Sequence, residues 1–149
     1  MITFPLKSGK YIISDPCYLF PDGEWTDFCN CIKYGNDPYQ PKNGNCESIY
    51  PQNSDSAFEM KYKVQSFYVI PTAYGDGGYD LKENRKSIGI LGVDAGLLSV
   101  IPFELFKTWP DFEKLKDNDL GITIELEKDE VLKCSKGNFK LGKFSVKTN

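Results

Sequence analysis

The chain has 149 residues, a formal net charge of −3 at pH 7, no histidine and a single arginine, Arg85. This length predicts one domain over residues 1–149 that can bury its own core without a disulfide or a metal. The negative charge argues against duplex nucleic acid as a partner, because clustered Lys and Arg supply most of the affinity for a duplex.

The N-terminal third carries mixed signals. Residues 11–13 follow a Ser8-Gly9 turn and predict a strand, which Asp15-Pro16 breaks and residues 18–20 resume. Apolar residues then recur with helical spacing, which predicts one face of a short helix; they are Trp25, Phe28, Cys29 and Ile32. Residues 36–56 contain three Pro and four Asn with almost no periodicity, so we expect a long loop there.

The middle of the chain has the strongest β signals. Two strand-like stretches fill residues 58–70, of which 67–70 are apolar on both faces. In residues 88–101 two apolar arms flank Asp94-Ala95-Gly96, a three-residue connection with glycine where a left-handed conformation is often needed. We expect residues 67–70 and 88–93 to be buried centrally.

The C-terminal third begins with two predicted short helices, at residues 102–106 and 111–116. Residues 122–126 alternate apolar and polar, and a last hairpin is expected around the turn 135–138, with a bulge at Gly142 where the apolar parity slips. Acids dominate residues 111–130, whereas five lysines and no acid follow Glu130, which cross-strand pairing of the two segments would explain. The predicted fold is a β-rich α+β domain, with an antiparallel or mixed sheet or a barrel-like core and two or three short helices.

Cysteine usage bears on location and on metals. The five cysteines are an odd number, the N-terminus lacks a signal-peptide apolar region, and no apolar run could span a membrane, so we expect reduced thiols in a cytoplasm and no membrane partner. Four of them could form a zinc site, although the Cys-x-Cys spacing is outside the common pattern and small buried hydrophobes are the alternative; these four are Cys17, Cys29, Cys31 and Cys46. We predict no metal and no cofactor.

The missing histidines remove the usual Ser/His and Cys/His mechanisms, so no catalytic residue is predicted. Asp15-Pro16-Cys17-Tyr18 is a compact turn. Asp15 either caps local N–H groups or, with Cys17 and Tyr18, lies at the edge of a pocket.

Residues 72–80 leave a buried strand as a Gly-rich loop, Thr72-Ala73-Tyr74-Gly75-Asp76-Gly77-Gly78-Tyr79-Asp80. Its glycines can expose N–H groups to an anion, and its tyrosines can stack on a base or a sugar. The alternative is a tight turn with packed tyrosines. The predicted ligand residues in it are Thr72, Tyr74, Gly75, Asp76, Gly77 and Tyr79.

Asp94 either starts its turn or joins the same pocket. Grouped with Asp15 and Asp76, it could also hold Mg²⁺ or act as acid and base. Arg85 lies in a polar turn and would suit a bound phosphate if that turn folds over the pocket.

Three patches of the sequence resemble a set of small uncharacterised proteins of phages and bacteria. They are Asp15–Tyr18, Thr72–Tyr79 and the Val-Asp-Ala-Gly segment through Pro102. By analogy of size and source only, such proteins include sponges that sequester cyclic-nucleotide or ADP-ribose-type immune signals, in the host cytoplasm if phage-encoded.

Three functions therefore stay open. The first is binding of a small nucleotide-like ligand by one chain or a homo-oligomer. The second is an Mg-dependent hydrolase that uses the three aspartates. The third is a protein-interaction module whose 36–56 loop binds a host protein.

Overall fold

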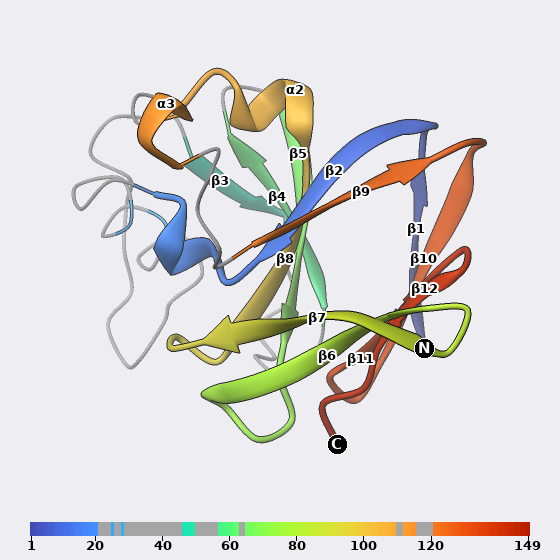
Figure 1. Cartoon of the computed structure of the whole chain (residues 1–149). Coiled ribbons are helices and arrows are strands. Elements are labelled where there is room, and N and C mark those ends of the chain that lie inside the picture. The colour runs from blue at the N-terminus through green and yellow to red at the C-terminus, as the bar shows by residue number, and fades with distance from the viewer. Residues whose placement is uncertain are drawn as a thin grey trace.

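The computed structural model describes residues 1–20, 25, 28, 46–49, 57–62, 65–109, 112–115 and 121–149; at 46–49 and 115 it describes the backbone alone. Within these residues the chain forms two six-stranded antiparallel sheets and two short helices (Figure 1). The predicted β-rich fold is therefore confirmed, and the core is antiparallel and not closed into a barrel. In the described ranges no helix has the length and apolar character that a membrane-spanning helix needs.

The first sheet has the strand order β1-β10-β11-β12-β6-β7. Its strands are β1 (Ile2–Leu6), β6 (Gly77–Glu83), β7 (Lys86–Val93), β10 (Glu130–Ser135), β11 (Asn138–Leu141) and β12 (Phe144–Val146). The second sheet has the order β3-β4-β5-β8-β2-β9. Its strands are β2 (Gly9–Ser14), β3 (Cys46–Ile49), β4 (Phe58–Tyr62), β5 (Gln65–Pro71), β8 (Leu97–Pro102) and β9 (Ile122–Leu126).

Two hydrophobic clusters lie on opposite faces of the second sheet. One cluster joins the two sheets and includes Ile13, Ile70, Leu91 and Leu132. The other packs Phe67 and Ile101 beneath α2 (Phe103–Phe106), together with Phe28 and Trp109. Because both of its faces are covered, the middle of this sheet reads as continuous apolar sequence.

That arrangement confirms one central strand and corrects the other. β5, which contains residues 67–70, is an inner strand of the second sheet, as expected. β7 is an edge strand of the first sheet, and Ile90 on it is 66% exposed. The two arms that flank residues 94–96 do not pair with each other, because β7 pairs with β6 and β8 pairs with β2 and β5. The connection therefore crosses from one sheet to the other (Figure 1).

The two helices predicted after residue 101 are present, whereas two other local predictions are wrong. The helix predicted from Pro102 is α2, and the next is α3 (Phe112–Leu115). Residues 16–18 form a 3₁₀ turn and not a resumed strand, because Pro16 favours the start of a helical turn. Gly142 lies in a second tight turn between Leu141 and Phe144 and not in a bulge.

Two predicted segments fall mostly outside the described residues. Trp25 and Phe28 are helical, and the rest of the expected helix is not described. Within the expected 36–56 loop, residues 46–49 form strand β3, and the remainder lies outside the described ranges.

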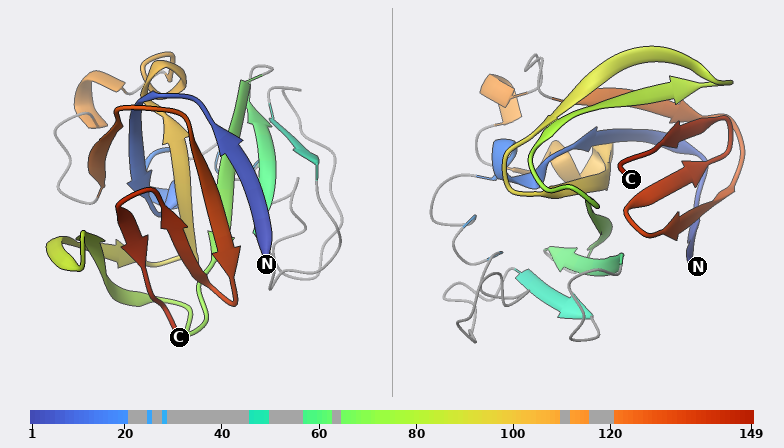
Figure 2. Two further views of the ribbon diagram at one scale, coloured as in Figure 1. Left: turned by 90° about the vertical axis from the view of Figure 1, so that its right-hand side faces the viewer. Right: turned by 90° about the horizontal axis from the view of Figure 1, so that it is seen from below.

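Both ends of the chain meet the turn between β10 and β11 (Figure 2). Ile2 is the register partner of Cys134 in β10. At the other end, Asn138 accepts hydrogen bonds from the backbone N–H of Thr148 and of Asn149. This corner of the molecule therefore combines the start of the sequence with two segments near its end.

Candidate ligand-binding site

Asp15 fastens two of the predicted site segments together. Its side chain is fully buried, and Oδ1 accepts the N–H of Cys17 at 2.9 Å, which confirms the local cap. Its second oxygen, Oδ2, accepts the N–H groups of Asp94 at 2.9 Å and Ala95 at 2.7 Å. One carboxylate therefore holds the Asp-Pro-Cys-Tyr turn against the connection between the sheets.

Thr72 attaches the third segment. Its N–H donates to the carbonyl of Gly96 at 2.9 Å, and its hydroxyl donates to the carbonyl of Gly75 at 2.6 Å. A Cβ on Gly96 would lie 3.4 Å from Cα of Gly75, and Gly96 has a φ of +72°, so glycine suits this close approach. Residues 15–18, 72–76 and 94–96 form one unit, which we call the loop assembly.

The predicted residues have different surroundings within the loop assembly. Burial, together with a hydrogen bond to Asp94, raises the pKa of the Tyr18 hydroxyl above its ordinary value. Burial, reinforced by the negative charge of Asp15, raises the pKa of the Cys17 thiol to about 12. Asp76 and Asp94 are exposed, so both carboxylates are accessible from solvent.

The two tyrosines of the Gly-rich segment also differ. The hydroxyl of Tyr79 donates to the carbonyl of Gly75 at 2.9 Å, and its ring packs against the core between the sheets. Tyr74 is 77% exposed. Gly77 and Gly78 pair with Val93 and Gly92 as the first residues of β6, so the loop is shorter than the predicted 72–80.

Arg85 does not belong to this site. It lies in the turn that joins Glu83 to Lys86, at the end of the β6–β7 hairpin opposite to Gly77 and Val93. The length of β6 separates the two ends by roughly 20 Å. The expectation that this turn folds over the pocket is therefore wrong.

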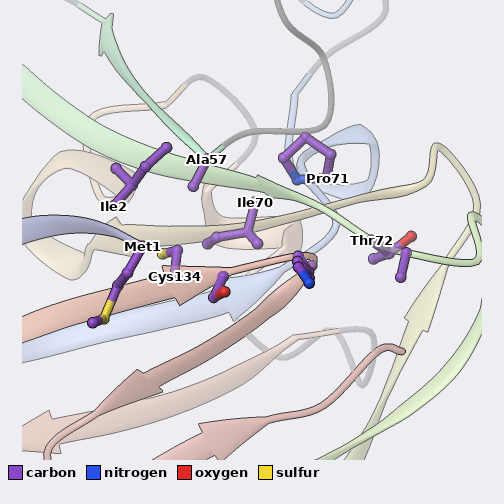
Figure 3. Close-up of a pocket in the computed structure, with 11 residues that line it drawn as sticks. Met1, Ile2, Ala57, Ile70, Pro71, Thr72 and Cys134 are labelled. Atoms are coloured by element: carbon purple, nitrogen blue, oxygen red, sulfur yellow. The ribbon is translucent and has the colours of Figure 1, made fainter.

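A cavity of about 570 Å³ opens beside the loop assembly and shares Thr72 and Ala73 with it. It lies where β1, the end of β5 and the β10–β11 turn meet, and Figure 3 shows Ile70 and Cys134 between Met1 and Thr72. Its buried wall is apolar and its rim carries exposed Ser135 and Lys136. The lining residues are Met1, Ile2, Ala57, Ile70, Pro71, Thr72, Ala73, Cys134, Ser135, Lys136 and Gly137.

Thr148 holds one wall of the cavity in place. It is 2% exposed, and its Oγ1 accepts the N–H of Ala73 at 2.9 Å and donates to the carbonyl of Gly137 at 2.7 Å. The segment that leaves β5 and the β10–β11 turn are thereby connected through a single hydroxyl. Sequence reasoning predicted this turn but assigned it no role, because the contact that makes it a cavity wall joins Thr148 to Ala73, which is 75 positions away.

Cys134 provides a direct probe of this cavity. Burial raises the pKa of its thiol to about 12, from an ordinary value of 9.0. At a pH of ~8.5 we therefore expect iodoacetamide to alkylate Cys134 much more slowly in the folded protein than in denaturant, as measured by mass spectrometry of the peptide. The Cys134 thiol ionises at a lower pH in the unfolded chain than in the folded protein. Its burial therefore stabilises the fold fully below pH 9, and this stabilisation is lost as the pH rises toward 12. Equal alkylation rates in the folded and unfolded chain would contradict the burial.

The metal alternatives receive a partial answer. Among the residues that the structure describes, no group of three or more His, Cys, Asp or Glu side chains could hold a metal ion. Cys134 and Cys17 are free thiols. Cys29, Cys31 and the side chain of Cys46 lie outside the described ranges, so the four-cysteine zinc site stays a hypothesis.

Comparison with known proteins gave no match, whether to protein-family models, to curated proteins or to solved structures. The resemblance to small phage and bacterial proteins therefore stays a prediction from the three sequence patches.

Proposed function

We propose that this protein binds a small nucleotide-like ligand in the cavity beside the loop assembly and releases it unchanged. By analogy with the phage proteins, the role of such binding is to sequester a nucleotide-type signal in the cytoplasm. The observation that carries the proposal is the cavity itself, which adjoins the segments on which the sequence resemblance rests.

The size and lining of the cavity support a ligand of this class. Small-molecule sites usually measure ~300–1,000 Å³ and combine an apolar wall with a few placed polar groups. Here Ile70 and Cys134 form part of the buried wall, and Thr72, Ser135 and Lys136 bring hydroxyl groups and one ammonium group. An ammonium group at the rim suits a phosphate, and the wall suits the face of a base or a sugar.

Tyr74 is the side chain best suited to stacking. It follows Ala73 of the cavity wall and is 77% exposed, so it has no evident packing role. Tyr79 packs against the core and donates a hydrogen bond, so its replacement would also disturb the fold. Tyr74→Ala should therefore weaken binding, with little effect on the melting temperature of the free protein.

The hydrolase alternative has less support. It uses Asp15 as a metal ligand or a base, and that carboxylate already accepts three N–H groups. The interaction alternative relies on the 36–56 segment, of which the structure describes only the backbone of β3.

A thermal-shift screen against AMP, ADP-ribose, a cyclic mononucleotide and a cyclic dinucleotide tests the proposal. At a ligand concentration of 100 times Kd, we expect a rise of about 5–10 °C in Tm. Ser135→Trp, at the exposed rim, should abolish the rise. Thr123→Trp is the matched control, because Thr123 is an exposed strand residue away from the cavity, and it should retain the rise.

Chromatography of the recovered ligand separates binding from turnover. Unchanged nucleotide supports the proposal, whereas a metal-dependent product would favour the hydrolase. No shift with any of the four nucleotides, or an equal shift in Ser135→Trp, would contradict the assignment of the cavity as their site.

A further inference from the structure

The outer face of the first sheet carries a continuous row of lysine and hydroxyl side chains. Register partners in neighbouring antiparallel strands point to the same face, so six residues line up across all six strands. The rows on either side of it, which include Leu132 and Cys134, face the core. This outer row consists of Thr3, Lys133, Lys140, Ser145, Lys82 and Ser87.

Two lysines of this row oppose each other directly. Lys133 and Lys140 are register partners in β10 and β11, and both are exposed. Like charges in directly opposite positions of a sheet reduce stability. The fold therefore places a like-charged pair at the centre of an exposed face.

The acids predicted to compensate these lysines lie elsewhere. β9, which carries Glu125, pairs with β2 in the second sheet, so the predicted pairing of the acidic and basic segments is wrong. Ion pairs between described residues join Lys7 to Asp129, Lys107 to Glu104 and Lys143 to Glu83. None of them involves a lysine of the outer row.

A few acids approach the row at its margins. Asp129 and Glu130 line a shallow depression together with Lys133 and Lys140, and Asp129 also pairs with Lys7 and accepts the N–H of Ser8. Asp80 precedes Lys82 by two positions on β6 and accepts a hydrogen bond from Ser87. The centre of the row, from Lys133 to Lys82, contains no acid.

We propose that the outer row binds an extended acidic segment of a partner protein. Neighbouring strands are ~4.8 Å apart, so the row spans roughly 24 Å, and alternate carboxylates of an extended chain, ~6.8 Å apart, can reach its lysines. The hydroxyl group of Ser145 adds a hydrogen-bond donor between Lys140 and Lys82, and that of Thr3 adds one at the end of the row.

Features of the same face argue against nucleic acid as the occupant. No member of the row is aromatic, so no base could stack there. The only arginine, Arg85, lies outside the row, and the net charge of −3 opposes a long polyanion.

The test uses a fluorescent poly-glutamate peptide as the probe and anisotropy as the readout, at low salt. The double variant Lys133→Gln/Lys140→Gln should bind it about fivefold more weakly. Lys114→Gln/Lys128→Gln removes two other exposed lysines with the same change in net charge and should bind like the unmodified protein. The row variant should also melt about 2 °C higher, because a repulsive pair is gone.

Weaker binding by the row variant but not by the control variant is what a binding surface predicts, whereas a merely solvated face would weaken both equally. Equal weakening in both double variants, or no binding of poly-glutamate by the unmodified protein, would overturn the proposal. Tighter binding of a thymidine oligonucleotide than of poly-glutamate would overturn it in favour of nucleic acid.

Discussion

Replacement of Asp15 by alanine should lower the free energy of unfolding by about 3–5 kcal/mol, because three N–H groups lose a charged acceptor within a buried turn. Asp15→Asn should have an effect of similar size. An amide has only one acceptor oxygen, and its NH₂ group would face N–H donors. Urea denaturation followed by tryptophan fluorescence measures both.

Asp76→Asn is the matched control. Asp76 belongs to the same loop assembly but is exposed, and it takes part in no hydrogen bond or ion pair found within the described residues. Its substitution should change the free energy of unfolding by less than about 0.5 kcal/mol. A similar stability for Asp15→Ala and Asp76→Asn would show that the carboxylate does not hold the segments together.

Gly137→Ala should destabilise the protein by about 2–4 kcal/mol, through backbone strain and crowding together. Gly137 has a φ of +85°, and a Cβ there would lie 2.5 Å from Oγ1 of Thr148 and 2.6 Å from N of Ala73. Both contacts belong to the wall of the cavity. In this variant Cys134 should therefore be alkylated faster than in the unmodified protein, and the chain should unfold at a lower urea concentration.

Gly75→Ala separates the two causes. Gly75 has a similar φ of +80°, but no atom lies within 4 Å of the position of its Cβ. Only the cost of the left-handed backbone applies, which is about 1–2 kcal/mol. If Gly75→Ala proved as destabilising as Gly137→Ala, the contact between Thr148 and the β10–β11 turn would have no energetic role.

The sequence predicted the meeting of the three motifs for a sound physical reason. Asp15, Thr72 and Asp94 each follow an apolar strand at a turn signal. The ends of β2 and β5 lie at the same edge of the second sheet because both strands pair antiparallel with β8, and residues 94–96 lead into the start of β8 at that edge. Arg85 has the same local character, but the register of the β6–β7 hairpin places it at the opposite end. Register depends on the partner strand, which the local pattern around Arg85 does not specify.

The burial of individual strands was predictable only in part. Residues 67–70 and 88–93 both read as apolar runs, yet β5 is central and β7 is an edge strand. Ile88 and Ile90 face outward because alternation places Leu91 and Val93 on the core side. Which of two apolar runs receives a second neighbour is decided by the packing of the whole chain.

The cavity could not be predicted from local patterns. Its walls come from residues 1–2, 57, 70–73 and 134–137, which are brought together by the pairing of β1 with β10 and by Thr148. Of these segments, only residues 72–73 belong to a stretch predicted to contact a ligand, the start of the Gly-rich loop. The turn at 135–138 adds no signal for a ligand, because its pattern predicts an ordinary hairpin.

The most direct test of the proposed function is an NMR titration of the folded protein with the nucleotide that gives the largest thermal shift. We predict saturable shifts of the backbone amide signals of Thr72, Ala73, Lys136 and Gly137, with little change at the distant Arg85 turn. The same titration of Ser135→Trp should leave these signals in place. Saturable shifts confined to residues outside the cavity, or no shifts with any nucleotide, would contradict the account.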